Sequence, residues 1–145
     1  MKKIILGSLV ALTLAAGGQA NAVDYPCTTG ARNPEDKGSC YECTLSWFNS
    51  SIKCRYWDPI GFVAVGSKIS KSIDDCVGND DGQMVHGLGA GDSCKDYNLD
   101  NDLLTAKCRN VAGVYVDTSI SVPDFFAAGD PPAGSLTSKT IVCVQ

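Results

Sequence analysis

The sequence has few of the residues on which most enzymes and metal sites depend. His86 is the only histidine among 145 residues, and no set of residues around it resembles a nucleophilic triad, in which a third group orients the base. The acidic pairs Asp74-Asp75 and Asp80-Asp81 are adjacent residues, which point apart on a strand. Val77 stands where a calcium loop needs its first ligand. We therefore predict a protein without catalytic activity, metal ion or other cofactor.

Clusters of basic residues and long apolar runs are missing as well. Residues 1–22 have the pattern of a secretory signal peptide, with Lys2 and Lys3, an apolar segment over 4–16 and a small-residue cleavage site ending at Ala22. Beyond it, sixteen acidic and ten basic residues give a net charge of −6, which opposes binding to nucleic acid and anionic membrane surfaces. The apolar segment is too short to span a membrane. We predict a secreted, extracellular protein that does not insert into membranes.

Two segments of the chain repeat one pattern 54 positions apart. Cys40 and Cys54 are 14 positions apart, as are Cys94 and Cys108, and a leucine and a Lys-Cys-Arg sequence recur in register. Such self-similarity constrains the whole fold, and here it predicts one pseudo-symmetric domain. The predicted parts are an N-terminal arm at 23–37 and a domain at 38–145 that contains repeat one at 38–86, a flexible linker at 87–91, repeat two at 92–137 and a tail at 138–145.

The eight cysteines all follow residue 22, and their even number predicts four disulfides in an oxidising compartment. Eight cysteines allow about a hundred pairings, and the sequence alone does not choose among them. A zinc site at Cys40-x-x-Cys43 is the alternative, although such a pair occurs once in the chain. The predicted pairs are Cys40–Cys54 and Cys94–Cys108, from their spacing in the repeats, Cys27–Cys143, from their positions near the termini, and Cys43–Cys76, from the remainder.

Short strand-like segments separated by turns predict an all-β fold with short helical turns. No segment has a long apolar period of 3.6 residues, so long helices are not expected. Asn49-Ser50-Ser51, at the tip of a predicted hairpin, is an N-glycosylation sequence. The predicted elements are strands over Tyr41–Ser46, Ser51–Trp57 and Phe62–Val65, a helical turn near Ser72–Val77, and a tight turn at Asp81-Gly82.

Each unit resembles a cyanovirin-N homology repeat in the order of its cysteines, leucine, glycine, isoleucine and Asn-x-Asp-Gly turn. The resemblance covers about residues 38–137 and implies a β-rich lectin of two pseudo-symmetric halves that binds mannose-rich glycans without metal. It also implies a monomer or a homodimer that swaps domains through the linker. The matching residues are Cys40, Leu45, Cys54, Gly61, Ile69 and Asn79-Asp80-Asp81-Gly82 in the first unit, and Cys94, Leu99, Cys108, Gly113 and Ile120 in the second.

The resemblance further implies a carbohydrate site formed by the Asn-x-Asp-Gly turn and by residues beside the cysteines of the second repeat. Sugar hydroxyls both donate and accept hydrogen bonds, so carboxylate, amide, hydroxyl and guanidinium groups suit them. The alternative is that residues 79–82 form only a turn, because these residue types favour turns. The implied site consists of Asn79, Asp80, Asp81, Asp92, Ser93, Arg109, Asn110 and Val111.

A weaker site is implied at the corresponding positions of the first repeat. The second repeat has Gly129-Asp130-Pro131-Pro132 where an Asn-x-Asp-Gly turn is expected, so we expect the better site to be the working one. The missing turn also favours the alternative function, a protein-interaction or inhibitor module with decayed sugar sites. Trp57 could stack on a sugar or pack in the core. The weaker site consists of Lys37, Ser39, Arg55, Tyr56, Trp57 and Asp130.

Overall fold

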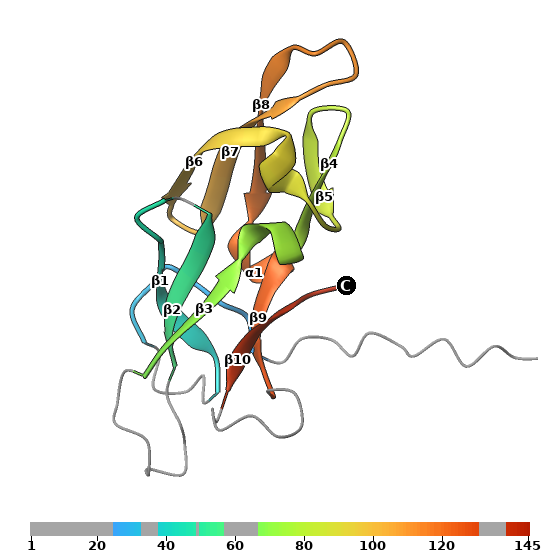
Figure 1. Ribbon diagram of the computed structural model, residues 1–145. Helices are drawn as coiled ribbons and strands as arrows, with labels where there is room; N and C mark the ends of the chain where they lie inside the picture. The colour runs from blue at the N-terminus through green and yellow to red at the C-terminus, as the bar shows by residue number, and fades with distance from the viewer. Residues whose placement is uncertain (1–24, 33–37, 49, 57–66, 131–138) are drawn as a thin grey trace, which may run out of the picture.

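A computed structural model describes residues 25–32, 38–48, 50–56, 67–130 and 139–145. Within these ranges the chain forms ten short strands and three single-turn helical segments, which confirms the predicted all-β fold class (Figure 1). None of the helices in this part of the chain is long and apolar enough to cross a membrane. The predictions for the signal peptide, Lys37, Asn49, Trp57, Gly61 and Phe62–Val65 lie outside the described residues.

The same order of elements occurs twice along the chain. A three-stranded antiparallel sheet is followed by a short helical turn and an antiparallel pair of strands, and η2 (Ala90–Asp92) lies between the two series. The first series contains β1 (Cys40–Leu45), β2 (Ser51–Tyr56), β3 (Ser67–Ser72), η1 (Ile73–Asp75), β4 (Val77–Asp80) and β5 (Gln83–His86). The second contains β6 (Cys94–Asp100), β7 (Leu103–Arg109), β8 (Tyr115–Ser121), α1 (Val122–Phe125), β9 (Phe126–Gly129) and β10 (Thr140–Cys143).

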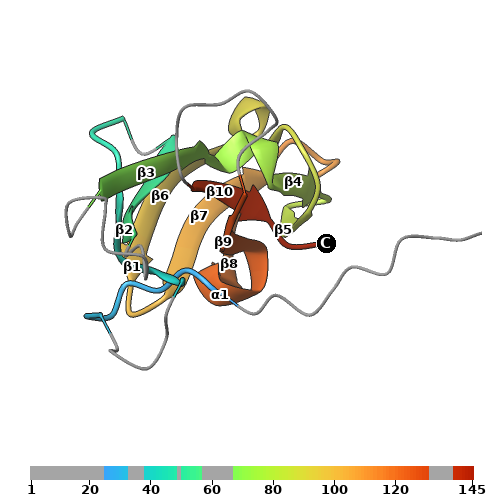
Figure 2. The ribbon, with the colours of Figure 1, turned by 90° about the horizontal axis from the view of Figure 1, so that it is seen from below.

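Each half packs its strand pair against the sheet of the other half. β5 contacts β8, and β10 contacts β3 (Figures 1 and 2). In the first contact, the backbone N–H of Met84 donates a buried hydrogen bond of 3.0 Å to the Thr118 hydroxyl. Ile52 of the first sheet, Leu104 of the second and Phe126 of β9 belong to one buried cluster. The halves therefore share a single core, and neither buries its apolar residues alone.

The linker between the halves is hydrogen-bonded to η1 and to the residue after it. The backbone N–H of Gly89 donates to the Asp74 carbonyl at 2.9 Å, and that of Gly87 donates to the Cys76 carbonyl at 3.2 Å. The backbone N–H of Gly91 donates to the Asp74 carboxylate. The glycine-rich composition predicted a flexible hinge, whereas Cys76 holds the beginning of the segment in place and Asp74 holds its middle and end.

Both three-stranded sheets contain a bulge at an acidic residue, but their registers differ. Glu42 and Asp96 have left-handed backbones, with φ of 48° and 57°, where the β1–β2 and β6–β7 registers shift. In the first sheet Leu45 pairs with Ile52 across residues 46–51, and in the second Leu99 pairs with Leu104 across residues 100–103. Because the connection in the first sheet is longer, the register of β2 against β1 is shifted by two residues relative to the register of β7 against β6.

This register difference makes the prediction for the first repeat wrong. Cys94 lies directly opposite Cys108, and this pair is bonded as predicted. Cys40 instead lies opposite Tyr56, so the Cys40–Cys54 pair does not form. The bulge places Cys43 opposite Cys54, and these two are bonded, which also excludes Cys43–Cys76. Cys40 bonds Cys27, which lies beside it in a parallel bridge, and the zinc alternative at Cys40 and Cys43 is therefore wrong.

The predicted Cys27–Cys143 pair is also wrong, because these residues lie on opposite edges of β9. The Cys27 backbone N–H donates to the Phe126 carbonyl, while Cys143 pairs with Phe126 from the other side. Two strand spacings of about 4.8 Å separate them, which is more than a disulfide spans. Cys143 instead bonds Cys76, which follows η1. Four disulfides indicate an oxidising environment.

A carboxylate at the β6–β7 turn fastens the N-terminal arm. The Thr28 hydroxyl donates to Asp102 Oδ2 at 2.8 Å, and the Thr29 backbone N–H donates to Asp102 Oδ1. The backbone N–H of Asp102 donates in return to the Thr29 hydroxyl at 3.0 Å. Burial raises the pKa of the Asp102 carboxyl, but the hydrogen bonds from Thr29 and Thr28 outweigh it and hold the pKa below the usual 3.8.

We expect the isosteric change Asp102→Asn to lower the free energy of unfolding by about 1 kcal/mol at neutral pH, because it removes charge-assisted hydrogen bonds at a partly exposed site. A lowered pKa in the folded state means that the unfolded chain binds the proton more readily. The ionised Asp102 carboxylate therefore stabilises the fold above about pH 4, and this stabilisation is lost as the pH falls below about 4. Urea unfolding at pH 7 and at about pH 2 measures this, with the exposed Asp100→Asn as control. A gap between wild type and variant that stays the same at both pH values would contradict the assignment.

Candidate functional site

The turn between β4 and β5 has the geometry that its sequence predicts. Asp81 and Gly82 have φ of 47° and 88°, as a two-residue hairpin turn with positive φ at both positions requires. A Cβ atom at Gly82 would lie 2.5 Å from Val116 Cγ2 and 3.3 Å from Asn110 Cβ. Glycine is thus required both by the backbone conformation and by the close approach of β8 and of the connection that precedes it.

Asn79 joins three segments that are distant in the sequence. Its side-chain amide donates to Ser93 Oγ and to the Arg109 carbonyl, both at 2.8 Å. Its Oδ1 accepts a hydrogen bond of 2.8 Å from the Gly82 backbone N–H. The Arg109 N–H donates to the Ser93 carbonyl at 2.8 Å, which closes the arrangement. Both amide hydrogens of Asn79 are used, so its principal role is to position the other residues.

The hairpin turn also fixes the connection between β7 and β8. Asp81 Oδ1 accepts a hydrogen bond of 2.8 Å from the Val111 backbone N–H. The Asn110 side chain accepts one of 2.9 Å from the Val114 N–H, and the Asn110 carbonyl accepts one of 2.9 Å from Gly113. The structure therefore brings the turn and the residues after Cys108 into direct contact, as the predicted site requires.

Three charged side chains around this framework remain available to a ligand. Asp80, Asp92 and Arg109 are exposed, and their side chains form no hydrogen bond or ion pair with the described residues. Val111 is 90% exposed beside them. Carboxylates and a guanidinium next to an apolar side chain suit a polyol that has hydroxyl groups and C–H faces. With Asp81 included, the site has three carboxylates and one guanidinium, so an uncharged ligand fits better than an anion.

The described members of the weaker site do not form a comparable group. Tyr56 is 2% exposed, so the prediction that it contacts sugar is wrong: β2 alternates, and Ile52, Cys54 and Tyr56 all point into the core. Arg55 pairs with Glu42 at 3.0 Å, and Asp130 pairs with Lys139 at 2.5 Å. Ser39 is half-buried.

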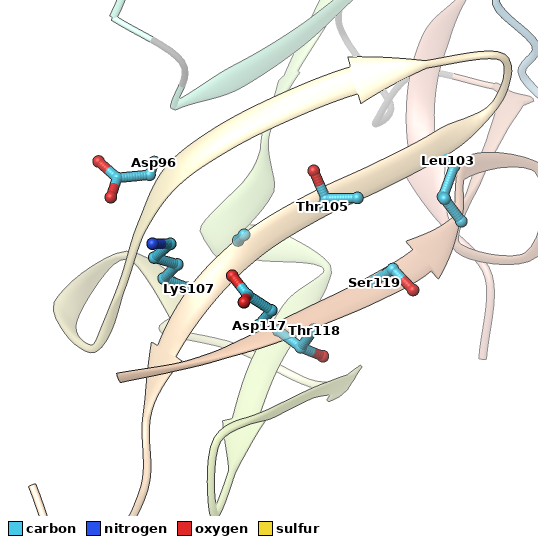
Figure 3. A pocket seen from close by; sticks show the side chains of 8 residues that line it. Asp96, Leu103, Thr105, Lys107, Asp117, Thr118 and Ser119 are labelled. Carbon is cyan, nitrogen blue, oxygen red and sulfur yellow. The ribbon is translucent and has the colours of Figure 1, made fainter. Parts of the chain in front are cut away.

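Sequence reasoning missed two depressions on the outer faces of the sheets. One, of about 460 Å³, is lined by side chains of β7 and β8, both polar and apolar, and by Asp96 of the bulge (Figure 3). The other, of about 270 Å³, lies at the corresponding bulge of the first sheet and includes Glu42, Lys53 and Lys68. The alternation of polar residues along these strands predicts an exposed face, but it does not show which side chains meet across strands.

A scan against protein-family models and a search of curated proteins found no match to this chain.

Proposed function

We propose that the protein is a secreted lectin that binds mannose-rich oligosaccharides reversibly, without catalysis or a metal ion. The observation that carries this proposal is the Asn79 arrangement, which joins the β4–β5 turn to Ser93 and Arg109. It holds exposed hydrogen-bonding groups in a fixed geometry, as a site that selects among similar sugars needs. The resemblance to cyanovirin-N homology repeats supplies the sugar class.

The mode of binding that we propose assigns different roles to the site residues. Asp80, Asp92 and Arg109 contact hydroxyl groups, because their side chains are exposed and bond to none of the residues that the structure describes. Val111 covers an apolar face of a sugar ring. Asn79 and Asp81 hold the two loops together and contact the ligand at most through a remaining oxygen lone pair.

We expect Arg109→Ala to weaken binding of a mannose-terminated oligosaccharide at least tenfold, because a hydrogen bond to a charged group contributes about 1.5–3 kcal/mol. Lys107→Ala is the matched control, since Lys107 is exposed on the same strand and lies outside the site. A glycan array with oxidised protein identifies the oligosaccharide, and calorimetry with and without a chelator measures its affinity. Equal affinities of the two variants would contradict the site, and loss of binding with the chelator would contradict metal-free binding.

The alternative function is a protein-interaction module on the same scaffold. Trp47 and Phe48, at the tip of the β1–β2 hairpin, are 92% and 85% exposed, and such aromatic residues are common anchors at protein interfaces. A blank glycan array from protein with intact disulfides and cooperative unfolding would favour this function over the lectin.

We propose a monomer as the principal form, since Asp74 holds the linker and both strand pairs reach the opposite sheet within one chain. A domain-swapped homodimer is the alternative form that the resemblance implies.

A further inference from the structure

The outer face of the first sheet carries basic side chains that come together only through strand pairing. Arg55 of β2 pairs with Lys68 of β3, and Lys53 pairs with Ser70 one step along the same face. Paired residues of neighbouring strands project from the same side of a sheet. All three basic residues are exposed, and each lines the depression of about 270 Å³. Lys53, Arg55 and Lys68 are called the basic face below.

Little negative charge opposes this face. Among the described residues that line the depression, Glu42 is the only carboxylate, and it is already paired with Arg55 at 3.0 Å. Neither Lys53 nor Lys68 forms an ion pair with any described residue. Two uncompensated cations therefore lie beside an Arg–Glu pair, on a protein whose net charge is −4.

The corresponding face of the second sheet has more carboxylates among its basic residues. Its depression is lined by Asp96, Asp117 and, as the one cation among the described lining residues, Lys107, and these side chains lie close to one another in Figure 3. Lys95, nearby, lies over the Tyr115 ring at 4.0 Å. The two faces share a backbone plan, including the bulge at an acidic residue, and differ in charge. The second face also carries Lys95, Lys107 and Arg109, so the difference lies in the carboxylates. Two of them line the depression of the second sheet, whereas Glu42, which lines that of the first, is already paired with Arg55.

We propose that the basic face binds the anionic groups of acidic polysaccharides, sulfate or carboxylate, independently of the mannose site. Lys53 and Lys68 neutralise the anion, and Arg55 offers further N–H donors to it. Glu42 and Thr44 line the same depression and can bond to ring hydroxyls. A ligand with both anionic and hydroxyl groups matches this mixture, whereas a carboxylate in the depression opposes a bare polyanion such as nucleic acid. The net charge predicted no polyanion binding, because the sequence does not show that these residues meet.

Dextran sulfate and uncharged dextran, which share a backbone, test this proposal by calorimetry at low and high salt. We expect wild type to bind dextran sulfate and not dextran, with an affinity that falls as salt increases. Lys53→Gln with Lys68→Gln should reduce the affinity at least tenfold. Lys95→Gln with Lys107→Gln removes the same charge from the second sheet and should change it less than twofold. Mannose binding and the unfolding midpoint, measured on both variants, show that the fold and the other site are intact.

Three results would overturn the proposal. Equal losses in the two variants would mean that total charge, and not the basic face, governs binding. Absence of binding by wild type would show that the face takes no sulfated polysaccharide. Tighter binding to vesicles containing phosphatidylserine, lost in the Lys53→Gln, Lys68→Gln variant, would assign the face to lipid headgroups. Because mannose binding is measured separately, failure of the lectin proposal would leave each of these readings unchanged.

Discussion

Replacing both Cys76 and Cys143 with alanine is expected to lower the free energy of unfolding by about 4 kcal/mol, the largest loss for any of the four disulfides. The chain-entropy model relates stabilisation to the logarithm of the loop closed in the unfolded state. This bond closes a separation of 67 residues, whereas the other three close 11 to 14. It also joins β10 to the residue after η1, and so ties the last strand of the second half to the first half.

The matched control is Cys43→Ala with Cys54→Ala, which removes a bond between adjacent strands and should cost about 3 kcal/mol. Urea unfolding of the oxidised proteins gives both values, and a peptide map of the unreduced protein identifies the partners. A loss no greater than that of the control would contradict the role of the long connection. A fragment linking Cys27 to Cys143 would contradict the described pairing itself.

Features of the fold that depend on neighbouring residues could be predicted from the sequence. Asp81-Gly82 forms the tight turn that its composition indicates, since both residue types tolerate positive φ. The helical turn predicted near Ser72–Val77 contains η1, at Ile73–Asp75. Alternating short strands were enough to predict the all-β class.

Features that depend on register could not be predicted in the same way. Cys40–Cys54 and Cys94–Cys108 have the same spacing in sequence, yet only the second pair lies opposite in its hairpin. The difference comes from the length of the β1–β2 connection, which no property of the cysteines encodes. A two-residue shift keeps every side chain on its original face, so the apolar pattern gives no sign of it.

In the candidate site, too, some features could be predicted from the sequence, and others depend on contacts between distant segments. The sequence and the resemblance placed the turn beside the residues that follow Cys108, and the structure brings these segments together. They did not show that the Asn79 amide uses both hydrogens within the protein, because its partners Ser93 and Arg109 are 14 and 30 positions away. The sequence and the resemblance are enough to propose which residues form the site. The contacts in the structure are needed to say which of them hold the loops together and which are left to bind a ligand.

Changing Gly82 to alanine is expected to cost about 2–5 kcal/mol in unfolding free energy and to abolish binding of mannose-rich glycans. A left-handed backbone costs an alanine about 1–2 kcal/mol, and overpacking in a tight region adds about 1–3 kcal/mol. The second contribution arises because the new Cβ would lie 2.5 Å from Val116 Cγ2. Relief of this overlap moves the turn away from β8 and from the connection that precedes it, and with the turn moves the Gly82 N–H that bonds to Asn79.

Gly113→Ala separates the two contributions. Gly113 has a similar φ of 80°, but nothing lies within 4 Å of the position that its Cβ would occupy. It should therefore lose only the conformational part, about 1–2 kcal/mol, and should retain glycan binding. Thermal or urea unfolding and calorimetry with the same oligosaccharide measure both effects. Equal destabilisation of the two variants would show that Val116 moves aside freely, and full glycan binding by Gly82→Ala would show that the contact between the turn and the β7–β8 connection does not shape the site.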